Sequence, residues 1–525
     1  MLAILVLIGI ACAGTALNAA QRPNIVVILV DDMGFSDIGC YGSEIPTPNL
    51  DRLAANGLRF TQFYNTARCC PTRASLLTGL YPHQAGVGHM TDDKGVPGYL
   101  GRLNDSCVTI AEVLRPAGYF TAMSGKWHVG QNLGVTPWER GFDRSLNAPA
   151  GGFYFPESSR AQLFLNGQEI ANDDPRLPKA WYSTDLWTTF GLASAADKPF
   201  YLHLCHNAPH FPLQAPAEEI AKFRGKYKQG WSALRDERIR RQRELGIIDP
   251  AWKPAPLPDA VREWEQLTPA EQDRFDHLMA VYAAVVHRMD RAVGDLVAGL
   301  KQRGVLDKTL ILFMSDNGGN AESGPGGRTE GDPTTAASNW FCGESWAFLE
   351  NVPFRKYKHY NHEGGIATPL IAHWPQGIAA KNELRHQPAH LIDIMATCVE
   401  VGGAAYPRQF NDKPIQPMEG RSLVPAFGDQ PIQREALYWE HEGNAAIRVG
   451  DLKLVRLGRQ GPWELYDLKA DRTEQHDLAA ERPETVKDLA ARWDAWAERT
   501  HVVPYPGAKV KEAKKKAKRK AAASP

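Results

Sequence analysis

The sequence predicts an α/β protein whose large, mostly parallel sheet is covered by helices on both faces. Residues 23–30 form an uninterrupted β-branched run, which is typical of a strand buried on both sides. Similar runs alternate with helical periodicity, most clearly over 269–303, and this alternation indicates parallel strands joined by helices. Beyond about Arg421, short strand-like runs separated by turn residues predict a second, smaller antiparallel sheet with one helix. The recurring runs of the large sheet are residues 119–124, 200–205 and 308–314.

The chain divides into four predicted parts. Residues 1–20 have the length and small-residue ending of a signal peptide, and their apolar stretch is too short for a membrane anchor. Residues 22–425 form the large α/β domain, with a charged, proline-rich helical excursion inserted at 216–268. Residues 426–505 form the antiparallel subdomain, and residues 506–525 are a lysine-rich tail that we expect to be disordered.

Composition excludes several classes of protein. With 525 residues, 43% hydrophobic and 23% charged, the chain is neither a disordered polymer, a collagen-like fibre nor a disulfide-dense miniprotein. No apolar run after the first twenty residues is long enough to cross a bilayer. The net charge is zero, but the tail holds eight Lys or Arg against one Glu, which leaves a mildly acidic body of 52 basic and 59 acidic residues. Because the basic residues gather in a tail, a nucleic-acid-binding face is not predicted.

The eight cysteines are widely spaced and form no C-x-x-C pair, so neither a structural zinc site nor a thioredoxin-like centre is indicated. Cys12 lies in the apolar leader, where lipoprotein acylation is an alternative to simple cleavage. We expect export to the periplasm or the cell exterior. Seven cysteines remain after cleavage, and an odd number leaves at least one free, modified or paired between chains.

Two predicted strands end in oxygen-bearing side chains. Asp31 and Asp32 follow the first strand, and Asp316 and Asn317 follow the strand near residue 314. Ligands collect at the carboxyl edge of open α/β sheets, so adjacent strands would bring these groups to one point. Three carboxylates in one place repel one another unless a cation binds them. Ligation by oxygen atoms alone favours Ca²⁺ over Mg²⁺. Taken singly, each pair also fits a plain helix N-cap.

A second pattern surrounds Cys69. Pro71 suits the first turn of a helix and Gly79 its end, so Cys69 is placed at a helix N-terminus, where an anion is stabilised. Arg73 follows one turn later on the same face. A phosphatase-like thiolate loop is disfavoured, because it needs an arginine six residues after the cysteine, where Ser75 stands.

The run Cys69-x-Pro-Thr-Arg73-x-x-x-Leu-Thr-Gly79 resembles the signature of type I sulfatases, in which the cysteine is converted to formylglycine. Thr72 stands where serine is commoner. The resemblance extends from about Asn24 to Leu478 and looks closest to the bacterial arylsulfatase branch. Its other blocks, in the family's order, are Asp31-Asp32, Gly125-Lys-Trp-His128, Ala208-Pro-His-Phe-Pro212, Ser315-Asp-Asn-Gly318, Tyr357-Lys-His359, His362-Glu-Gly-Gly365 and Glu464-Leu-Tyr-Asp-Leu468.

The resemblance implies an alkaline-phosphatase-like fold, with 22–425 as the catalytic sulfatase domain. It implies a Ca²⁺-dependent enzyme that hydrolyses sulfate esters, such as aryl sulfates or sulfated glycans, after a maturation enzyme has made the formylglycine. In the implied mechanism, one hydroxyl of the hydrated aldehyde would attack sulfur, His210 or Lys358 would assist the leaving oxygen, and His128 would help to expel sulfate. Lys126, Lys358 and Arg73 offset the negative charge. The implied catalytic residues are Cys69, Arg73, Lys126, His128, His210 and Lys358, and the implied metal ligands are Asp31, Asp32, Cys69, Asp316 and Asn317.

Two other functions stay open on the sequence. A phosphonate or phosphate monoester hydrolase of the same superfamily needs the same groups, and a non-catalytic binder of sulfated glycans needs fewer of them. The substrate is not identified, although loops 145–187 and 321–351 are expected to set specificity. His83, His203 and His206 are interpreted as interior histidines, and Glu363 as a residue that orients its neighbours.

Overall fold

The computed structural model describes residues 22–195 and 198–506. The predicted signal peptide with Cys12, and the tail from residue 507, lie outside these residues. In the described part of the chain, no helix is both long and apolar enough to span a membrane.

A mixed sheet forms the centre of the molecule. Strand β1 (Asn24–Val30) lies between β7 (Phe200–Cys205) and β8 (Thr309–Ser315), and it is parallel to both. The described residues place eleven strands in this sheet. The mostly parallel α/β sheet predicted from the sequence is confirmed. The remaining strands run outward from β8 as β11 (Ala367–His373), β2 (Leu58–Tyr64) and β12 (Glu383–Arg385), with β13 (Ala389–His390) also on β2, and outward from β7 as β3 (Phe120–Lys126), β4 (Arg144–Ala148), β5 (Leu163–Leu165) and β6 (Gln168–Ile170).

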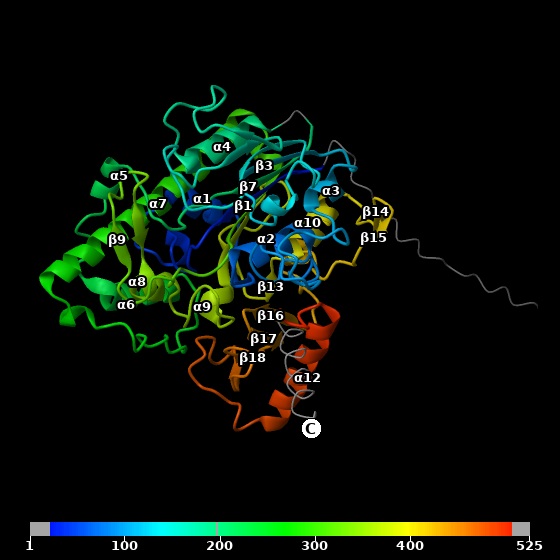
Figure 1. Cartoon of the computed structure of the whole chain (residues 1–525). Helices are drawn as coiled ribbons and strands as arrows, with labels where there is room; N and C mark the ends of the chain where they lie inside the picture. The colour runs from blue at the N-terminus through cyan, green and yellow to red at the C-terminus, as the bar shows by residue number, and fades with distance from the viewer. Residues whose placement is uncertain (1–21, 196–197, 507–525) are drawn as a thin grey trace, which may run out of the picture.

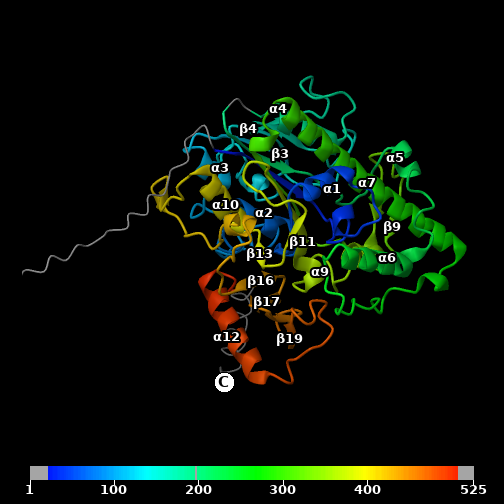
Figure 2. The ribbon, with the colours of Figure 1, turned by 180° about the vertical axis from the view of Figure 1, so that it is seen from behind.

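Helices cover both faces of this sheet (Figures 1 and 2). Every residue of β1 is buried, and its side chains alternate between two cores, as the period of two in a strand requires. Val26, Ile28 and Val30 pack beneath α1, α4 and α7, whereas Ile25 and Val27 pack beneath α2, α3 and α10. The helices are α1 (Pro48–Ala55), α2 (Cys69–Thr78), α3 (Ile110–Leu114), α4 (Ser183–Ala193), α5 (Ala217–Ala221), α6 (Gly230–Glu244), α7 (Pro269–Gln302), α8 (Gly343–Glu350), α9 (Glu363–Ile366), α10 (Asp393–Gly402) and α11 (Val424–Phe427).

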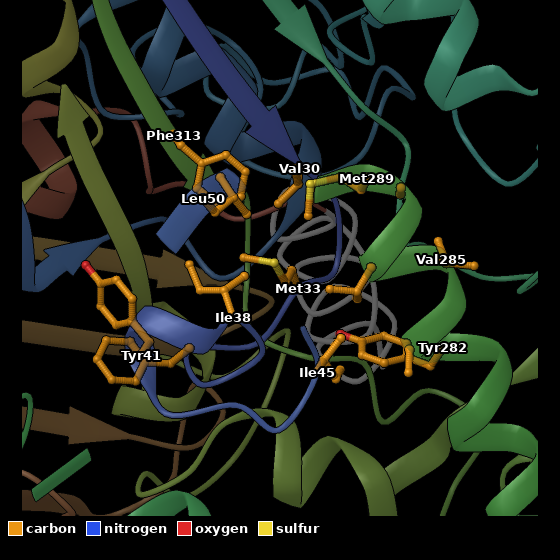
Figure 3. Packing of buried hydrophobic residues seen from close by; sticks show 14 of the residues in the cluster. Val30, Met33, Ile38, Tyr41, Ile45, Leu50, Tyr282, Val285, Met289 and Phe313 are labelled. Atoms are coloured by element: carbon orange, nitrogen blue, oxygen red, sulfur yellow. The ribbon is translucent and has the colours of Figure 1, made fainter. Parts of the chain in front are cut away.

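The loop after β1 is fixed by packing against α7. Figure 3 shows Met33 and Ile38 of this loop among side chains from β1, α1, α7 and β8. The Tyr282 hydroxyl of α7 donates to Asp37 Oδ2 at 2.7 Å. Burial of these apolar groups therefore holds the backbone directly downstream of Asp31 and Asp32.

The C-terminal part forms a separate four-stranded antiparallel sheet, as expected, made of β16 (Leu437–His441), β17 (Asn444–Val449), β18 (Leu452–Arg456) and β19 (Trp463–Asp467). Helix α12 (Pro483–Arg499) packs Trp493 and Trp496 against Ile447 and Leu454. This unit lies beside the main body at its β13 end (Figures 1 and 2). Two small hairpins lie elsewhere, β9 (Arg328–Glu330) with β10 (Asn339–Phe341) and β14 (Gln409–Phe410) with β15 (Lys413–Pro414). The loop predicted at 321–351 therefore contains two short strands and helix α8.

Candidate active site

The ends of β1 and β8 bring the four predicted oxygen ligands together. The two strands are in register, with Val30 opposite Ser315, so the residues that follow them are neighbours. The Asp32 N–H donates to Asp316 Oδ1 at 3.2 Å, and Asn317 Nδ2 donates to Asp32 Oδ1 at 2.7 Å. The carboxyl-edge argument made from the sequence therefore describes the geometry correctly.

The donor set fits a hard divalent cation. Asp31 Oδ1 and Asn317 Oδ1 are buried and accept no hydrogen bond, although buried oxygens of this kind normally have a partner. Burial and the nearby Asp31 raise the pKa of Asp316 well above its usual value, even though Arg73 opposes this shift. A cation bound to these oxygens would satisfy the orphaned atoms and relieve the repulsion between carboxylates.

Helix α2 delivers Cys69 and Arg73 to the same place. The helix begins at Cys69, and its backbone is anchored by Thr72, whose hydroxyl donates to the Asp316 carbonyl at 2.7 Å. Arg73 Nη2 pairs with Asp316 Oδ2 at 2.8 Å, and its Nη1 donates to the Lys126 carbonyl at 2.9 Å. Thr72, which replaces the commoner serine, thus joins the start of the helix to the end of β8 through its hydroxyl.

Lys126 and His128 come from the end of β3. Lys126 Nζ donates to Asp31 Oδ2 at 2.5 Å. Gly125 precedes it with φ of 112°, and a Cβ there would lie 1.8 Å from the Cys205 carbonyl, so only glycine fits. His128 lies beside Cys69, with a ring nitrogen within 4.8 Å of the thiol sulfur, and burial lowers the pKa of the imidazole below 6.5. His128 is therefore neutral at pH 7 and able to accept a proton.

The thiol of Cys69 is perturbed by these neighbours. The neighbouring Cys70 thiol lowers the pKa of Cys69 well below its usual value, and Lys126 and His128 act in the same direction against burial. Cys69 is 2% exposed. The side chain at this position is thus enclosed by groups that stabilise negative charge.

His210 and Lys358 complete the site from two loops. Lys358 Nζ lies 2.9 Å from Asp32 Oδ1 and 3.1 Å from Glu322 Oε2, and the two carboxylates raise the pKa of this lysine although burial opposes the shift. His210 Nε2 lies 3.5 Å from Asp32 Oδ2, while its Nδ1 faces the Phe211 carbonyl. Burial lowers the pKa of His210. At neutral pH Lys358 therefore keeps its proton, whereas His210 is less readily protonated.

Sequence reasoning missed two polar neighbours of Asp32 and Lys358. Asn320 Nδ2 donates to Asp32 Oδ2 at 2.9 Å, and Glu322 pairs with Lys358 and, at 2.9 Å, with Arg68. Asn320 ends the segment Asp316-Asn-Gly-Gly-Asn320, so the sequence did contain a signal for this residue. Backbone strain is a second signal that appears only in the structure, because Asp32 and His128 adopt φ of 64° and 56°.

Other residues singled out in the sequence lie outside this cluster. His83 pairs with Glu440 at 2.8 Å, and His203 and His206 are buried, as interior histidines should be. Glu363 contacts Lys453 and Arg472 rather than the site, which agrees with an orienting role. All seven described cysteines are free and buried.

The comparisons with known proteins agree with this geometry. The family model described as Sulfatase matches residues 23–404, and the one described as N-sulphoglucosamine sulphohydrolase, C-terminal, matches 354–495. The chain is 36% identical over 435 residues to an arylsulfatase of Klebsiella aerogenes, covering 78% of this chain and 93% of that protein. It is 34% identical to an uncharacterized sulfatase of Schizosaccharomyces pombe, covering 93% and 95%. The crystal structure of Ps i-CgsB in complex with k-i-k-neocarrahexaose has a TM-score of 0.66 and 27% identity, covering 91% of this chain and 93% of that one.

The chain has an α/β fold of the alkaline-phosphatase-like class, with the candidate site at the carboxyl ends of β1 and β8. The chain belongs to the sulfatase family, in its arylsulfatase-like branch, and it is a sulfuric ester hydrolase.

Proposed function

We propose that the chain hydrolyses sulfate esters of phenols or sugars with a formylglycine made from Cys69 and a divalent cation, Ca²⁺ rather than Mg²⁺. Asp31, Asp32, Asp316 and Asn317 would hold the cation together with residue 69. The observation that carries this proposal is that three carboxylates and one amide oxygen, two of them with orphaned oxygens, meet beside Cys69.

The two added groups supply chemistry that the unmodified chain lacks. When bound, the cation would neutralise the carboxylates and lower the pKa of a hydroxyl on residue 69, and the hydrated aldehyde would supply that hydroxyl. A second hydroxyl on the same carbon explains why a serine or cysteine would not suffice, since it lets sulfate leave by elimination rather than by a second attack on sulfur.

The charges of the site suit a sulfuryl group. Asp31, Asp32 and Asp316 are opposed by Arg73, Lys126 and Lys358, so the protein groups nearly balance one another. A divalent cation leaves a net positive charge, which stabilises a sulfate ester and the further negative charge that develops in the transition state. Lys126 is held charged because Asp31 raises its pKa against the effect of burial.

Proton transfers are assigned to the remaining groups. His128 lies beside residue 69 and has a lowered pKa, so it would accept the proton that residue 69 loses as sulfate departs. Lys358 keeps its proton firmly and stabilises the leaving oxygen by charge. His210 is the alternative proton donor on that side, and its lowered pKa makes it the weaker candidate at neutral pH.

The finer substrate class and the compartment are further parts of the proposal. The similarity to arylsulfatases supports aryl sulfates as substrates, and the similarity to a structure that contains k-i-k-neocarrahexaose supports sugar sulfates. Loops 145–187 and 321–351 would distinguish them, because Glu322 of the second loop already contacts Lys358. The apolar leader supports export to the periplasm or the cell exterior.

Peptide mass spectrometry and substrate comparison test the proposal. The peptide with residue 69 should be about 18 Da lighter than its unmodified form, which is the change from a thiol to an aldehyde. Cys69→Ala should abolish hydrolysis of p-nitrophenyl sulfate, whereas Cys70→Ala, a change at the adjacent buried thiol, should keep most of it. Faster hydrolysis of the corresponding phosphate or phosphonate would replace the sulfatase proposal, and substantial turnover by Cys69→Ala would end the formylglycine mechanism.

A further inference from the structure

A second cluster of possible metal ligands lies beside the candidate active site. His359 follows Lys358, and His441 and Glu442 end strand β16 and begin the turn to β17. One ligand atom of each of these three residues lies within 4.8 Å of the others. We propose that His359, His441 and Glu442 bind a divalent transition-metal ion, Zn²⁺ in the first place, at the junction of the main body and the C-terminal sheet.

One ring nitrogen of His359 and one of His441 lie near the carboxylate of Glu442. His359 Nδ1 lies 3.0 Å from Glu442 Oε2, and His441 Nε2 lies 3.7 Å from Glu442 Oε1. Ligand atoms that share a tetrahedral ion with bonds of 2.0–2.1 Å are about 3.3 Å apart. These separations are therefore close to those of a shared coordination sphere, and only small side-chain movements would be needed.

The buried imidazole of His441 is the observation that points to a ligand. This side chain has no solvent exposure, and neither of its ring nitrogens has a hydrogen-bond partner. An imidazole in that state has lost its water without replacement, which is costly unless another group binds it. Its ring faces His359 at 5.7 Å between centroids, so its free nitrogens lie next to the other proposed ligands.

The second nitrogen of His359 is already oriented as in metal sites. His359 Nε2 lies 3.0 Å from Glu322 Oε1 and Nδ1 lies 3.0 Å from Glu442 Oε2, so with the ring proton on Nε2 the lone pair of Nδ1 would be available to a metal ion. A histidine that binds a metal commonly donates its other N–H to a carboxylate in this manner. Arg68 Nη1 pairs with Glu322 and contacts both ring nitrogens of His359, Nδ1 at 3.2 Å, so it would have to move away from Nδ1 when the ion binds.

Backbone features support the same arrangement. His359 has φ of 81°, which is uncommon for a non-glycine residue, whereas the φ of 53° at Glu442 belongs to the two-residue turn that joins β16 to β17. Asn444 Nδ2 donates to the His359 carbonyl at 2.9 Å, which joins the β16–β17 turn to the loop that carries Lys358. His89 adds a third imidazole, with Nε2 3.2 Å from Glu442 Oε1, and can serve as a fourth ligand.

The ligand types decide which metal is expected. Two or three imidazoles with one carboxylate are typical of Zn²⁺ sites, whereas the carboxylate and amide oxygens near Asp31 suit Ca²⁺. The two sites therefore differ in preference and can be measured separately. A bound ion would hold the C-terminal sheet against the active-site loop through His441 and His359.

The test uses the full chain without a polyhistidine tag, which is stripped with EDTA, freed of EDTA, and then supplied with excess Ca²⁺ and with Zn²⁺. Zn²⁺ retained after gel filtration is measured by mass spectrometry, and Co²⁺ binding is followed by visible absorption. Wild type should retain one equivalent of Zn²⁺. His441→Gln and His359→Gln should bind Co²⁺ at least about 100-fold more weakly. His386→Gln, a change at an exposed histidine outside the cluster, should bind Co²⁺ as wild type does.

Two further variants distinguish loss of the metal site from loss of the fold and from loss of hydrolysis. Glu442→Gln alters a partly exposed turn residue, so its loss of Zn²⁺ with an unchanged circular dichroism spectrum supports the site even if His441→Gln fails to fold. Asp316→Asn should lose hydrolysis but keep Zn²⁺, which separates this inference from the proposed function. Equal Zn²⁺ retention by wild type and Glu442→Gln, or no retention by wild type, would overturn the inference.

Discussion

Arg73 Nη2 lies 2.8 Å from Asp316 Oδ2, and neither side chain has any exposure to solvent. The same guanidinium lies 3.7 Å from Asp31 Oδ2, so one cation bridges the two strand ends that form the site. A buried charge of this kind is stable only with partners on every side. Arg73 is thus part of the framework of the site as well as of its charge balance.

Replacing Arg73 with Ala should therefore damage both stability and activity. Breaking a buried ion pair leaves uncompensated carboxylates and costs about 3–5 kcal/mol of unfolding free energy. Urea denaturation followed by fluorescence measures this loss. Arg176→Ala is the control, because Arg176 pairs with Asp174 at 2.7 Å but is 58% exposed, and we expect no measurable change there. Similar effects of the two substitutions would contradict the role given to Arg73.

Removing the proposed calcium should inactivate and destabilise the enzyme reversibly. Ca²⁺ at a hundredfold excess over its dissociation constant would add about 2.7 kcal/mol to the unfolding free energy. Thermal unfolding with EDTA and with added Ca²⁺ measures this difference. Asp316→Asn should abolish most of the Ca²⁺-dependent rise in Tm, since it removes a ligand at the point where Asp31 and Asp316 repel each other. A wild-type Tm and activity that are unchanged by EDTA would rule out the cation site.

Much of this site could be predicted from the sequence, because the ends of strands and the spacing along a helix can be read from the residue pattern. Asp31 and Asp316 each follow an apolar strand-like run, and parallel strands end at a common edge, so the pattern brings them together provided that the two strands are adjacent. The positions of Cys69 and Arg73 follow from helical spacing. The register that sets Val30 opposite Ser315 depends on packing of the two strands and could not be read from either one.

Other features depend on tertiary contacts that no local pattern records. Glu322 lies in a glycine- and proline-rich loop without periodicity, yet it pairs with Lys358. His359 and His441 are far apart along the chain and meet only because the C-terminal sheet docks beside α9 and β13. The strained φ of His128 likewise arises from the surrounding fold rather than from the residue type.

The activity should fall in acid as His128 becomes protonated. Burial lowers the pKa of His128 below 6.5, so kcat/KM should keep its neutral-pH value down to that range and decline below it. His128→Gln should lose about 10²–10⁴ of the rate, and the remaining rate should lack this acid limb. His373→Gln is a matched control, because burial also lowers the pKa of His373 and it lies outside the site. An unchanged acid limb in His128→Gln would assign the limb to another group, His210 in the first place.

The buried contact between the C-terminal sheet and the main body should be acid-sensitive. Glu363 accepts from Lys453 Nζ at 2.8 Å and from Arg472 Nε at 2.7 Å, and both residues belong to the C-terminal part. Burial alone would raise the pKa of Glu363, but Lys453 and Arg472 outweigh it and lower the pKa to about 2. A lowered folded-state pKa contributes stability above the unfolded value near 4.5, and this contribution is lost as pH falls toward 2.

The measurement compares wild type with Glu363→Gln, in which this carboxylate is absent. The difference in their unfolding free energies should shrink by about 2 kcal/mol between roughly pH 6 and pH 3, because each unit of pKa difference corresponds to about 1.4 kcal/mol. Other carboxylates titrate in both proteins and cancel in the comparison. A difference that stays constant with pH would mean that Glu363 remains charged in the unfolded ensemble to the same extent as in the folded protein, and that the ion pairs do not lower its pKa.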